Sequence, residues 1–285
     1  MSRIKQTSTL IELLQKNIKE KNRFFYFRDK YRTTNISFEK LYESSLKFSA
    51  YLRHKGINKN DRVIIKTSNH FYWTVVFFGC IFSGTIIVPV DSNSSNDFLD
   101  MVNKKVQAKL ILFSINDIKE KSILSSLKAE KLFIEDIQNI IEKFSANEDI
   151  VFDVNDSNIA EIVFTSGTTS VPKGVVLTHK NISSNLLAAK PVFDKWMILF
   201  RLMINPKILS IVPLSHMYGQ VIGIFIPLII KSSVVYFNSI MPSEIIKAIK
   251  QEHIWILGIL PRLLSILKNY IVSAFDLDNE KFQNK

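Results

Sequence analysis

The chain has 285 residues, of which 47% are apolar and 22% charged, a composition that indicates a globular protein and excludes a low-complexity chain. Its single cysteine, Cys80, excludes an intramolecular disulfide and suits a reducing compartment. The five histidines lack the spacing of metal ligands, so no metal site built from protein nitrogen or sulfur is predicted. Residues 1–21 contain no continuous apolar run of the kind a signal peptide needs, so we expect a cytoplasmic protein.

The formal net charge of +11 is concentrated near the N-terminus. Residues 1–60 hold fourteen Lys or Arg against five Asp or Glu, which leaves 23 basic and 21 acidic residues for the rest. A basic segment suits an anionic membrane surface or a nucleic acid, and the alternative is lysine-rich helix faces in water. No zinc-finger spacing, aromatic RNA-binding signature or heptad array accompanies the charge. We therefore expect no nucleic-acid partner, while peripheral membrane contact stays open.

Strands and helices are predicted to alternate through the first half. Ser37 is a predicted N-cap and Gly56 a predicted C-cap of one helix, and Cys80 is predicted to be an inert buried thiol. The expected strands are 24–27, 61–65, 85–90, 110–113 and 131–134, and the expected helices are 37–54, 70–82, one from residue 96 and one ending at 144. This alternation predicts an α/β fold with mostly parallel sheets flanked by helices.

The chain is organised around residues 162–174, where an apolar strand enters a loop rich in hydroxyl groups. The loop holds hydroxyl residues, glycines and one lysine, among them Thr165, Ser166, Gly167, Thr168, Thr169, Ser170, Lys173 and Gly174. Hydroxyl and backbone N–H donors can surround a phosphate, and the lysine supplies the opposite charge. A Walker A loop is excluded, because Lys173 is followed by glycine and then by a second predicted strand at 175–178. The residues alone leave two interpretations, a strand–loop–strand phosphate site or a polar surface loop.

The second half continues the alternation. Thr178 is predicted to cap a helix through residue 188, and residues 196–204 are strongly apolar. The apolar run 217–230 is shorter than the roughly twenty residues of a membrane span, so a buried helix is predicted there. The remaining expected elements are strands at 208–212, 232–237 and 254–258, a helix at 242–252 and a helix from residue 260, in which Pro261 suits the first turn.

Residues 165–174 (TSGTTSVPKG) resemble the AMP-binding signature of the adenylate-forming enzymes: acyl-CoA synthetases, peptide-synthetase adenylation domains and luciferases. The only departure is Ser170, where the family usually has glycine. Residues 56–63, Trp73 and 79–91 are similar to early core segments of acyl-CoA synthetases, in which Gly79 and Gly84 allow close packing. Residues 213–219 (PLSHMYG) are similar to the pocket-forming motif of the family, and residues 260–267 to a helix start of fatty acyl-CoA ligases.

This resemblance implies the large N-terminal domain of the adenylate-forming fold. It also implies ATP-dependent activation of a carboxylic acid, by the last likeness a fatty acid, through an acyl-adenylate to a CoA thioester. Thr165 is implied to help position Mg²⁺, and His216 to lie near the substrate carboxylate and the attacked phosphorus. A lone histidine in apolar sequence is otherwise a core residue. The residues implied to hold the ATP phosphates are Thr165, Ser166, Gly167, Thr168, Thr169, Lys173 and Gly174.

Family members are considerably longer than this chain, and the resemblance covers most of residues 20–270. We therefore expect residues 1–285 to form a partial AMP-binding domain without the later core segments and the C-terminal lid. Such a chain alone is expected to bind ATP weakly and not to make acyl-CoA at a meaningful rate. Two other hypotheses stay open. One is a non-catalytic remnant or interaction module that binds ATP weakly or needs a second polypeptide for the missing half, and the other is a basic membrane- or nucleic-acid-binding protein.

Overall fold

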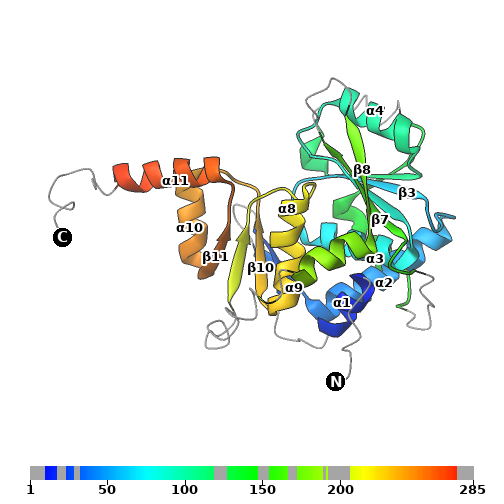
Figure 1. Cartoon of the computed structure of the whole chain (residues 1–285), viewed down its shortest axis with the longest axis horizontal. Helices are drawn as coiled ribbons and strands as arrows, with labels where there is room; N and C mark the ends of the chain where they lie inside the picture. Colours follow the sequence, from blue (N-terminus) through cyan, green and yellow to red (C-terminus); the bar gives the residue numbers. More distant parts are fainter. Residues whose placement is uncertain are drawn as a thin grey trace.

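The protein folds into two mainly parallel sheets with helices between and around them (Figure 1). The computed structural model describes residues 10–17, 24–28, 33–118, 127–146, 154–165, 172–188, 191 and 206–274. Sheet A has five strands in the order β11-β9-β10-β1-β2, and sheet B has six in the order β6-β5-β3-β4-β7-β8. Helix α3 contacts β1 of sheet A and β4 of sheet B, so it lies between the two sheets. The predicted α/β fold class is confirmed.

Sheet B carries the strand that leads into the hydroxyl-rich loop. Its strands are β3 (Arg62–Lys66), β4 (Ile86–Pro89), β5 (Leu110–Phe113), β6 (Glu130–Phe133), β7 (Ile159–Thr165) and β8 (Lys173–Thr178). Neighbouring strands are parallel except for the antiparallel pair β7 and β8. Strands β4 and β5 are buried along their whole length, as expected for parallel strands covered on both faces.

Sheet A joins the N-terminal part of the chain to its second half. Its strands are β1 (Phe24–Arg28), β2 (Thr33–Ser37), β9 (Lys207–Ser210), β10 (Ser233–Phe237) and β11 (Ile254–Gly258). Strand β1 lies parallel to β10, with Phe25 opposite Val234, and antiparallel to β2. The sequence did not predict β2, because Ile36 is the one apolar residue among Thr-Thr-Asn-Ile-Ser. Its side chain is also the one that β2 buries.

The helices cover both sheets, and most of them were predicted. Helix α3 is apolar on all sides and buries Trp73, Phe77 and Phe78 completely. It also buries Cys80, and burial raises the pKa of this thiol to about 12, as an inert cysteine requires. The helices are α1 (Leu10–Asn17), α2 (Phe38–His54), α3 (Phe71–Ser83), α4 (Asn96–Val106), α6 (Ile137–Ile141), α8 (Met217–Gln220), the π-helix η3 (Val221–Phe225), α9 (Ile226–Ile230), α10 (Pro242–Glu252), α11 (Pro261–Ala274), the 3₁₀ turns η1 (Ile115–Asp117) and η2 (Ile134–Asp136), and one over residues 179–188.

Local capping signals were predicted correctly for α2. The hydroxyl of Ser37 accepts the N–H of Lys40 at 3.1 Å, and Gly56 has a φ of +70° just after the helix. The N–H of Gly56 donates to Arg53 and that of Ile57 to Leu52, which together form a Schellman motif. The run 217–230 is a mainly buried helix, as predicted, with a π-helical turn in its middle. The apolar stretch 196–204 lies outside the described residues.

Replacing Gly79 by alanine is expected to lower the free energy of unfolding by about 1–2 kcal/mol. A Cβ at this position would lie 2.7 Å from Cδ1 of Phe48 and 3.1 Å from the carbonyl oxygen of Ser45, on the neighbouring helix α2. Alanine favours a helix over glycine by about 1 kcal/mol, but the added Cβ would press on Phe48, which is wholly buried. Urea unfolding of the variant and the wild type measures the difference. An unchanged or higher midpoint for Gly79→Ala would contradict the steric argument.

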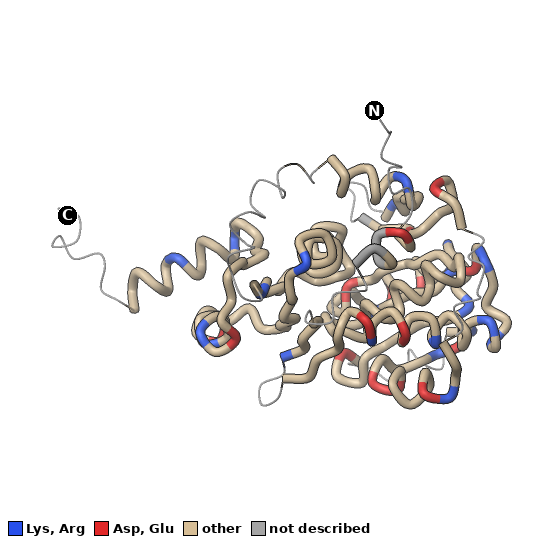
Figure 2. Tube along the Cα trace, turned by 90° about the horizontal axis from the view of Figure 1, so that it is seen from below, with Lys and Arg blue, Asp and Glu red and all other residues tan. Residues whose placement is uncertain are grey.

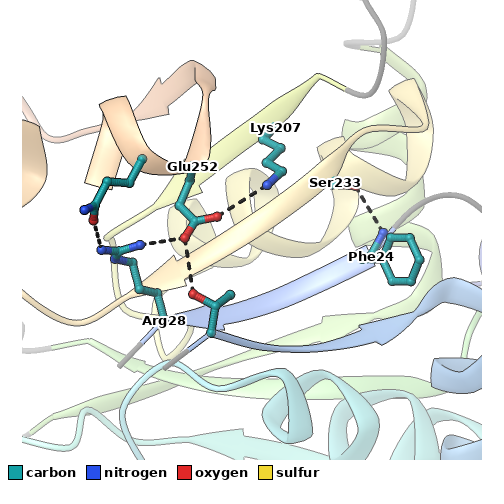
Figure 3. A network of polar contacts seen from close by, with 7 residues as sticks. Phe24, Arg28, Lys207, Ser233 and Glu252 are labelled. Atoms are coloured by element: carbon teal, nitrogen blue, oxygen red, sulfur yellow. Dashed lines mark hydrogen bonds and ion pairs between the residues drawn. The ribbon is translucent and has the colours of Figure 1, made fainter. Parts of the chain in front are cut away.

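A polar network links β1 and β2 to β9 and to α10 (Figure 3). Glu252 receives Arg28 at 2.6 Å, Thr33 at 3.2 Å and Lys207 at 3.3 Å, while Arg28 also donates to Gln251. Burial would raise the pKa of Glu252, but the hydrogen bond from Arg28 and the charge of Lys207 outweigh it, so this pKa is lowered. The network joins β1, β2 and β9 to the end of α10 and has a structural role.

The described basic residues of the N-terminal part are largely paired with acids. Arg28, Lys40, Lys47 and Lys55 each contact a carboxylate within 2.9 Å. Figure 2 shows Lys and Arg interspersed with Asp and Glu over the helices around sheet B. Within the described residues this distribution favours solvated helix faces over a continuous basic surface. Among all the residues that the structure describes, no helix is both long and apolar enough to cross a membrane.

Candidate functional site

The hydroxyl-rich loop connects the two antiparallel strands that the sequence predicted. Thr165 ends β7 and pairs with Lys173 at the start of β8, and Phe164 pairs with Gly174. The side chain of Lys173 is exposed. The loop positions Ser166, Gly167, Thr168 and Thr169 lie outside the described residues. Because Thr165 pairs with Lys173, β7 ends and β8 begins at the same end of the antiparallel pair.

His216 and the loop end of β7 line one cavity of about 470 Å³. The cavity lies at the carboxyl ends of β4 and β7, where the chain from β9 of sheet A approaches sheet B. Its lining combines apolar side chains with hydroxyl, carboxylate and imidazole groups: Pro89, Val90, Asp91, Ser94, Ser95, Phe98, Val163, Phe164, Ser215 and His216. The structure thus places His216, a candidate from the sequence, beside the strand that opens the predicted phosphate loop. It is half-exposed and not a core residue.

Asp91 is the direct partner of His216. Nε2 of His216 lies 3.3 Å from Oδ2 of Asp91, and the N–H of Asn93 donates to Oδ1 of Asp91 at 2.8 Å. The hydrogen bond with Asp91 raises the pKa of His216, although partial burial opposes this. The same hydrogen bond lowers the pKa of Asp91, against the effect of its burial. The pair favours a protonated imidazole, which suits an anionic ligand.

Asn69 anchors the segment that carries His216. Its amide Nδ2 donates to the carbonyl of Val212 at 3.0 Å, and its Oδ1 accepts the N–H of Leu214 at 2.8 Å. The segment is also tightly folded, because a Cβ on Gly219 would lie 2.0 Å from the carbonyl oxygen of Pro213. Sequence reasoning missed Asn69 and Asp91 as site residues. The signal for both was position, since each follows a predicted strand near its carboxyl end, where α/β sheets bind ligands.

Magnesium is the metal ion that the sequence resemblance implies for this site. Among the residues that the structure describes, no group of three or more His, Cys, Asp or Glu could hold a metal ion. Magnesium is commonly held by few protein ligands together with substrate phosphates, so this donor set fits an ion that enters with a nucleotide. Thr165 is the last residue of β7, and its role in positioning magnesium stays a prediction.

Comparison with known proteins identifies the family. A family profile described as AMP-binding enzyme matches residues 14–284. The luciferin 4-monooxygenase of Photuris pensylvanica is 28% identical over 207 residues, which cover 65% of this chain and 37% of that protein. Long chain acyl-CoA synthetase 8 of Arabidopsis thaliana is 24% identical over 208 residues, which cover 64% of this chain and 28% of that protein.

The fold is also found in solved structures. A fatty acyl-adenylate ligase from L. pneumophila, in complex with acyl adenylate and pyrophosphate, superimposes with a TM-score of 0.70 and 21% identity. The match covers 88% of this chain and 44% of that one. Each of these matches spans less than half of the other protein's length.

Proposed function

The chain belongs to the family of AMP-binding enzymes, and we propose that it activates a carboxylic acid with ATP as part of an acid–thiol ligase. In this reaction a carboxylate oxygen attacks the α-phosphorus of ATP and pyrophosphate leaves, giving an acyl-adenylate. The thiol of CoA then attacks the acyl carbon, and AMP leaves with the pair of electrons of the broken bond. The observation that carries the proposal is that His216 and the loop end of β7 line the same cavity.

The proposed roles follow from the chemistry of each group. Lys173 and the loop donors from Thr165 to Thr169, with Gly174, hold the ATP phosphates, where a fixed cation opposes the charge of the leaving pyrophosphate. Magnesium, when bound with ATP, neutralises further phosphate charge. His216, whose protonated form the hydrogen bond with Asp91 favours, lies beside the carboxylate as it approaches the phosphorus. The carboxylate and the ATP phosphates are both anions and repel each other. Lys173 and the protonated form of His216 reduce that repulsion.

A fatty acid is the proposed substrate class. Phe98, Val163 and Phe164 give the cavity an apolar wall that suits an acyl chain. The name of one relative, long chain acyl-CoA synthetase 8 of Arabidopsis thaliana, refers to a long acyl chain. We place the activity in the cytoplasm, with any membrane contact peripheral.

A second candidate function is an interaction module that acts with another polypeptide. Strand β11 is an edge of sheet A, and its Trp255 is 58% exposed. Helix α11, which projects from this end in Figure 1, has the exposed apolar side chains Leu264 and Ile266. Apolar groups next to an open sheet edge favour a covering protein segment. In this candidate, the covering segment supplies what the longer relatives carry beyond the matched region.

The test is acid-dependent exchange between ATP and labelled pyrophosphate by purified 1–285, with and without an added C-terminal half from a related ligase. We expect little exchange by 1–285 alone and fatty-acid-dependent exchange after addition. Weak ATP binding without exchange in either condition would favour the interaction module. Strong exchange by 1–285 alone would show that this chain holds a complete active site.

A further inference from the structure

Glu161 and Gln220 are polar side chains that lie wholly inside the protein, each 0% exposed. Nε2 of Gln220 donates a hydrogen bond to Oε1 of Glu161 at 2.5 Å. Glu161 belongs to β7 of sheet B, whereas Gln220 ends α8, which follows β9 of sheet A. In the described part of the protein, Oε2 of Glu161 and Oε1 of Gln220 have no hydrogen-bond partner.

Stability alone does not explain this pair. Burial raises the pKa of Glu161 to about 7, and only the hydrogen bond from Gln220 opposes this effect. A buried polar pair with unsatisfied oxygens loses hydration that its one hydrogen bond does not replace, and apolar side chains of the same shape would avoid that loss. A buried polar link between two elements can instead fix their relative position.

Glu161 and Gln220 are each close in the chain to residues of the candidate site. Side chains two residues apart share a face of a strand, so Glu161 and Val163 lie on one face of β7. Val163 lines the cavity, and Thr165 opens the predicted phosphate loop. On the other side, the backbone N–H of Gln220 donates to the carbonyl of His216 at 3.0 Å.

Close packing at Gly219 and Gly223 restricts the backbone on both sides of Gln220. A Cβ on Gly219 would lie 2.0 Å from the carbonyl oxygen of Pro213, and a Cβ on Gly223 would lie 2.8 Å from Oγ of Ser210. The backbone on both sides of Gln220 therefore has little freedom to move. A shift of α8 relative to β7 must stretch or break the hydrogen bond to Glu161.

We propose that Glu161 and Gln220 are positioning residues that hold the loop end of β7 and His216 in a fixed relation across the two sheets. The inference deepens the proposed function, because the relation it fixes is that between the phosphate side and the carboxylate side of the site. Neither residue touches the substrates in this proposal, and both act through the backbone of their own elements.

The test uses variants of the full chain that keep side-chain length. Glu161→Met and Gln220→Met each remove the link, the double variant removes it without leaving an unpaired buried partner, and Glu161→Gln keeps an oxygen that accepts from Gln220. Hydrogen–deuterium exchange is followed in residues 159–165 and 213–220. We expect each methionine variant to speed exchange in both segments, and Glu161→Gln to leave exchange close to that of the wild type. Where a single variant does not fold, the double variant decides.

ATP binding, measured by calorimetry, gives the functional result. The double variant is expected to bind ATP about tenfold more weakly while keeping its thermal midpoint, and Glu161→Gln to bind nearly as the wild type does. Faster exchange only in the segment that carries the substitution would overturn the inference, as would unchanged ATP affinity in a folded double variant. A wild-type chain that binds no ATP would argue against the proposed function, and the exchange measurement would then decide the positioning role by itself.

Discussion

Replacing Lys173 by alanine is expected to lower fatty-acid-dependent ATP–pyrophosphate exchange, in the presence of the complementing C-terminal half, by about 100-fold or more. Lys173 is exposed at the first position of β8 and pairs across the hairpin with Thr165. It thus stands where the hydroxyl-rich loop returns to the sheet. A fixed cation at this point stabilises the charge that develops on the leaving pyrophosphate. Water molecules in its place would have to reorient before they could stabilise the same charge.

The matched control is Lys180→Ala, which removes the same charge from another exposed lysine. Lys180 is the second residue of the helix 179–188, which follows β8 away from the loop end of the hairpin. An exposed charge at a distance is screened by salt, so this variant is expected to keep exchange within about twofold of the wild type. Equal losses in the two variants would mean that net charge matters rather than a phosphate contact. A wild-type rate for Lys173→Ala would remove Lys173 from the site.

Local sequence signals predicted most elements of this fold. The cap at Ser37, the glycine after α2 and the alternation of apolar runs each depend on residues close together in the chain. Glycine at position 79 indicated close packing, and the structure places Phe48 of α2 against it. These signals are informative because capping and close helix packing require particular residue types at particular positions.

The parts that the sequence missed depend on contacts between distant residues. Strand β2 has weak apolar alternation and exists because β1 offers it an edge within sheet A. Asp91 gains its role only because His216, in the segment that follows β9 of sheet A, comes within 3.3 Å. Glu161 is an acidic residue inside an apolar strand, which was a visible anomaly, but its partner Gln220 lies 59 positions away. Such pairings are set by topology and not by local propensity.

The free energy of unfolding is expected to depend on pH through Glu161. Its pKa is raised to about 7 in the fold, against an ordinary value of 4.5, so between these pH values the folded state holds a proton that the unfolded state has lost. Stability from this group is therefore fully present below pH 4.5 and is lost as the pH rises to about 7. The loss is on the order of 3 kcal/mol, because each pKa unit corresponds to about 1.4 kcal/mol.

Two histidines, one buried and one partly buried, act in the opposite direction and must be separated from this effect. Burial lowers the pKa of His70 and of His179 to about 4, so both stay neutral in the fold where the unfolded chain binds protons. Their contribution rises with pH between about 4 and 6.5. The pH dependence of the wild type alone therefore does not isolate Glu161, and a difference between two proteins is needed.

Glu161→Gln supplies that difference, because glutamine keeps the shape and the acceptor for Gln220 but does not titrate. Urea unfolding of both proteins from pH 4.5 to 8 is expected to show the variant gaining stability over the wild type as the pH rises, with most of the change below about pH 7. The histidine contributions cancel in the difference, because both proteins contain them. Parallel curves for the two proteins would show that the buried carboxyl of Glu161 keeps its ordinary pKa, and that its side chain reaches water or a donor when the protein is in solution.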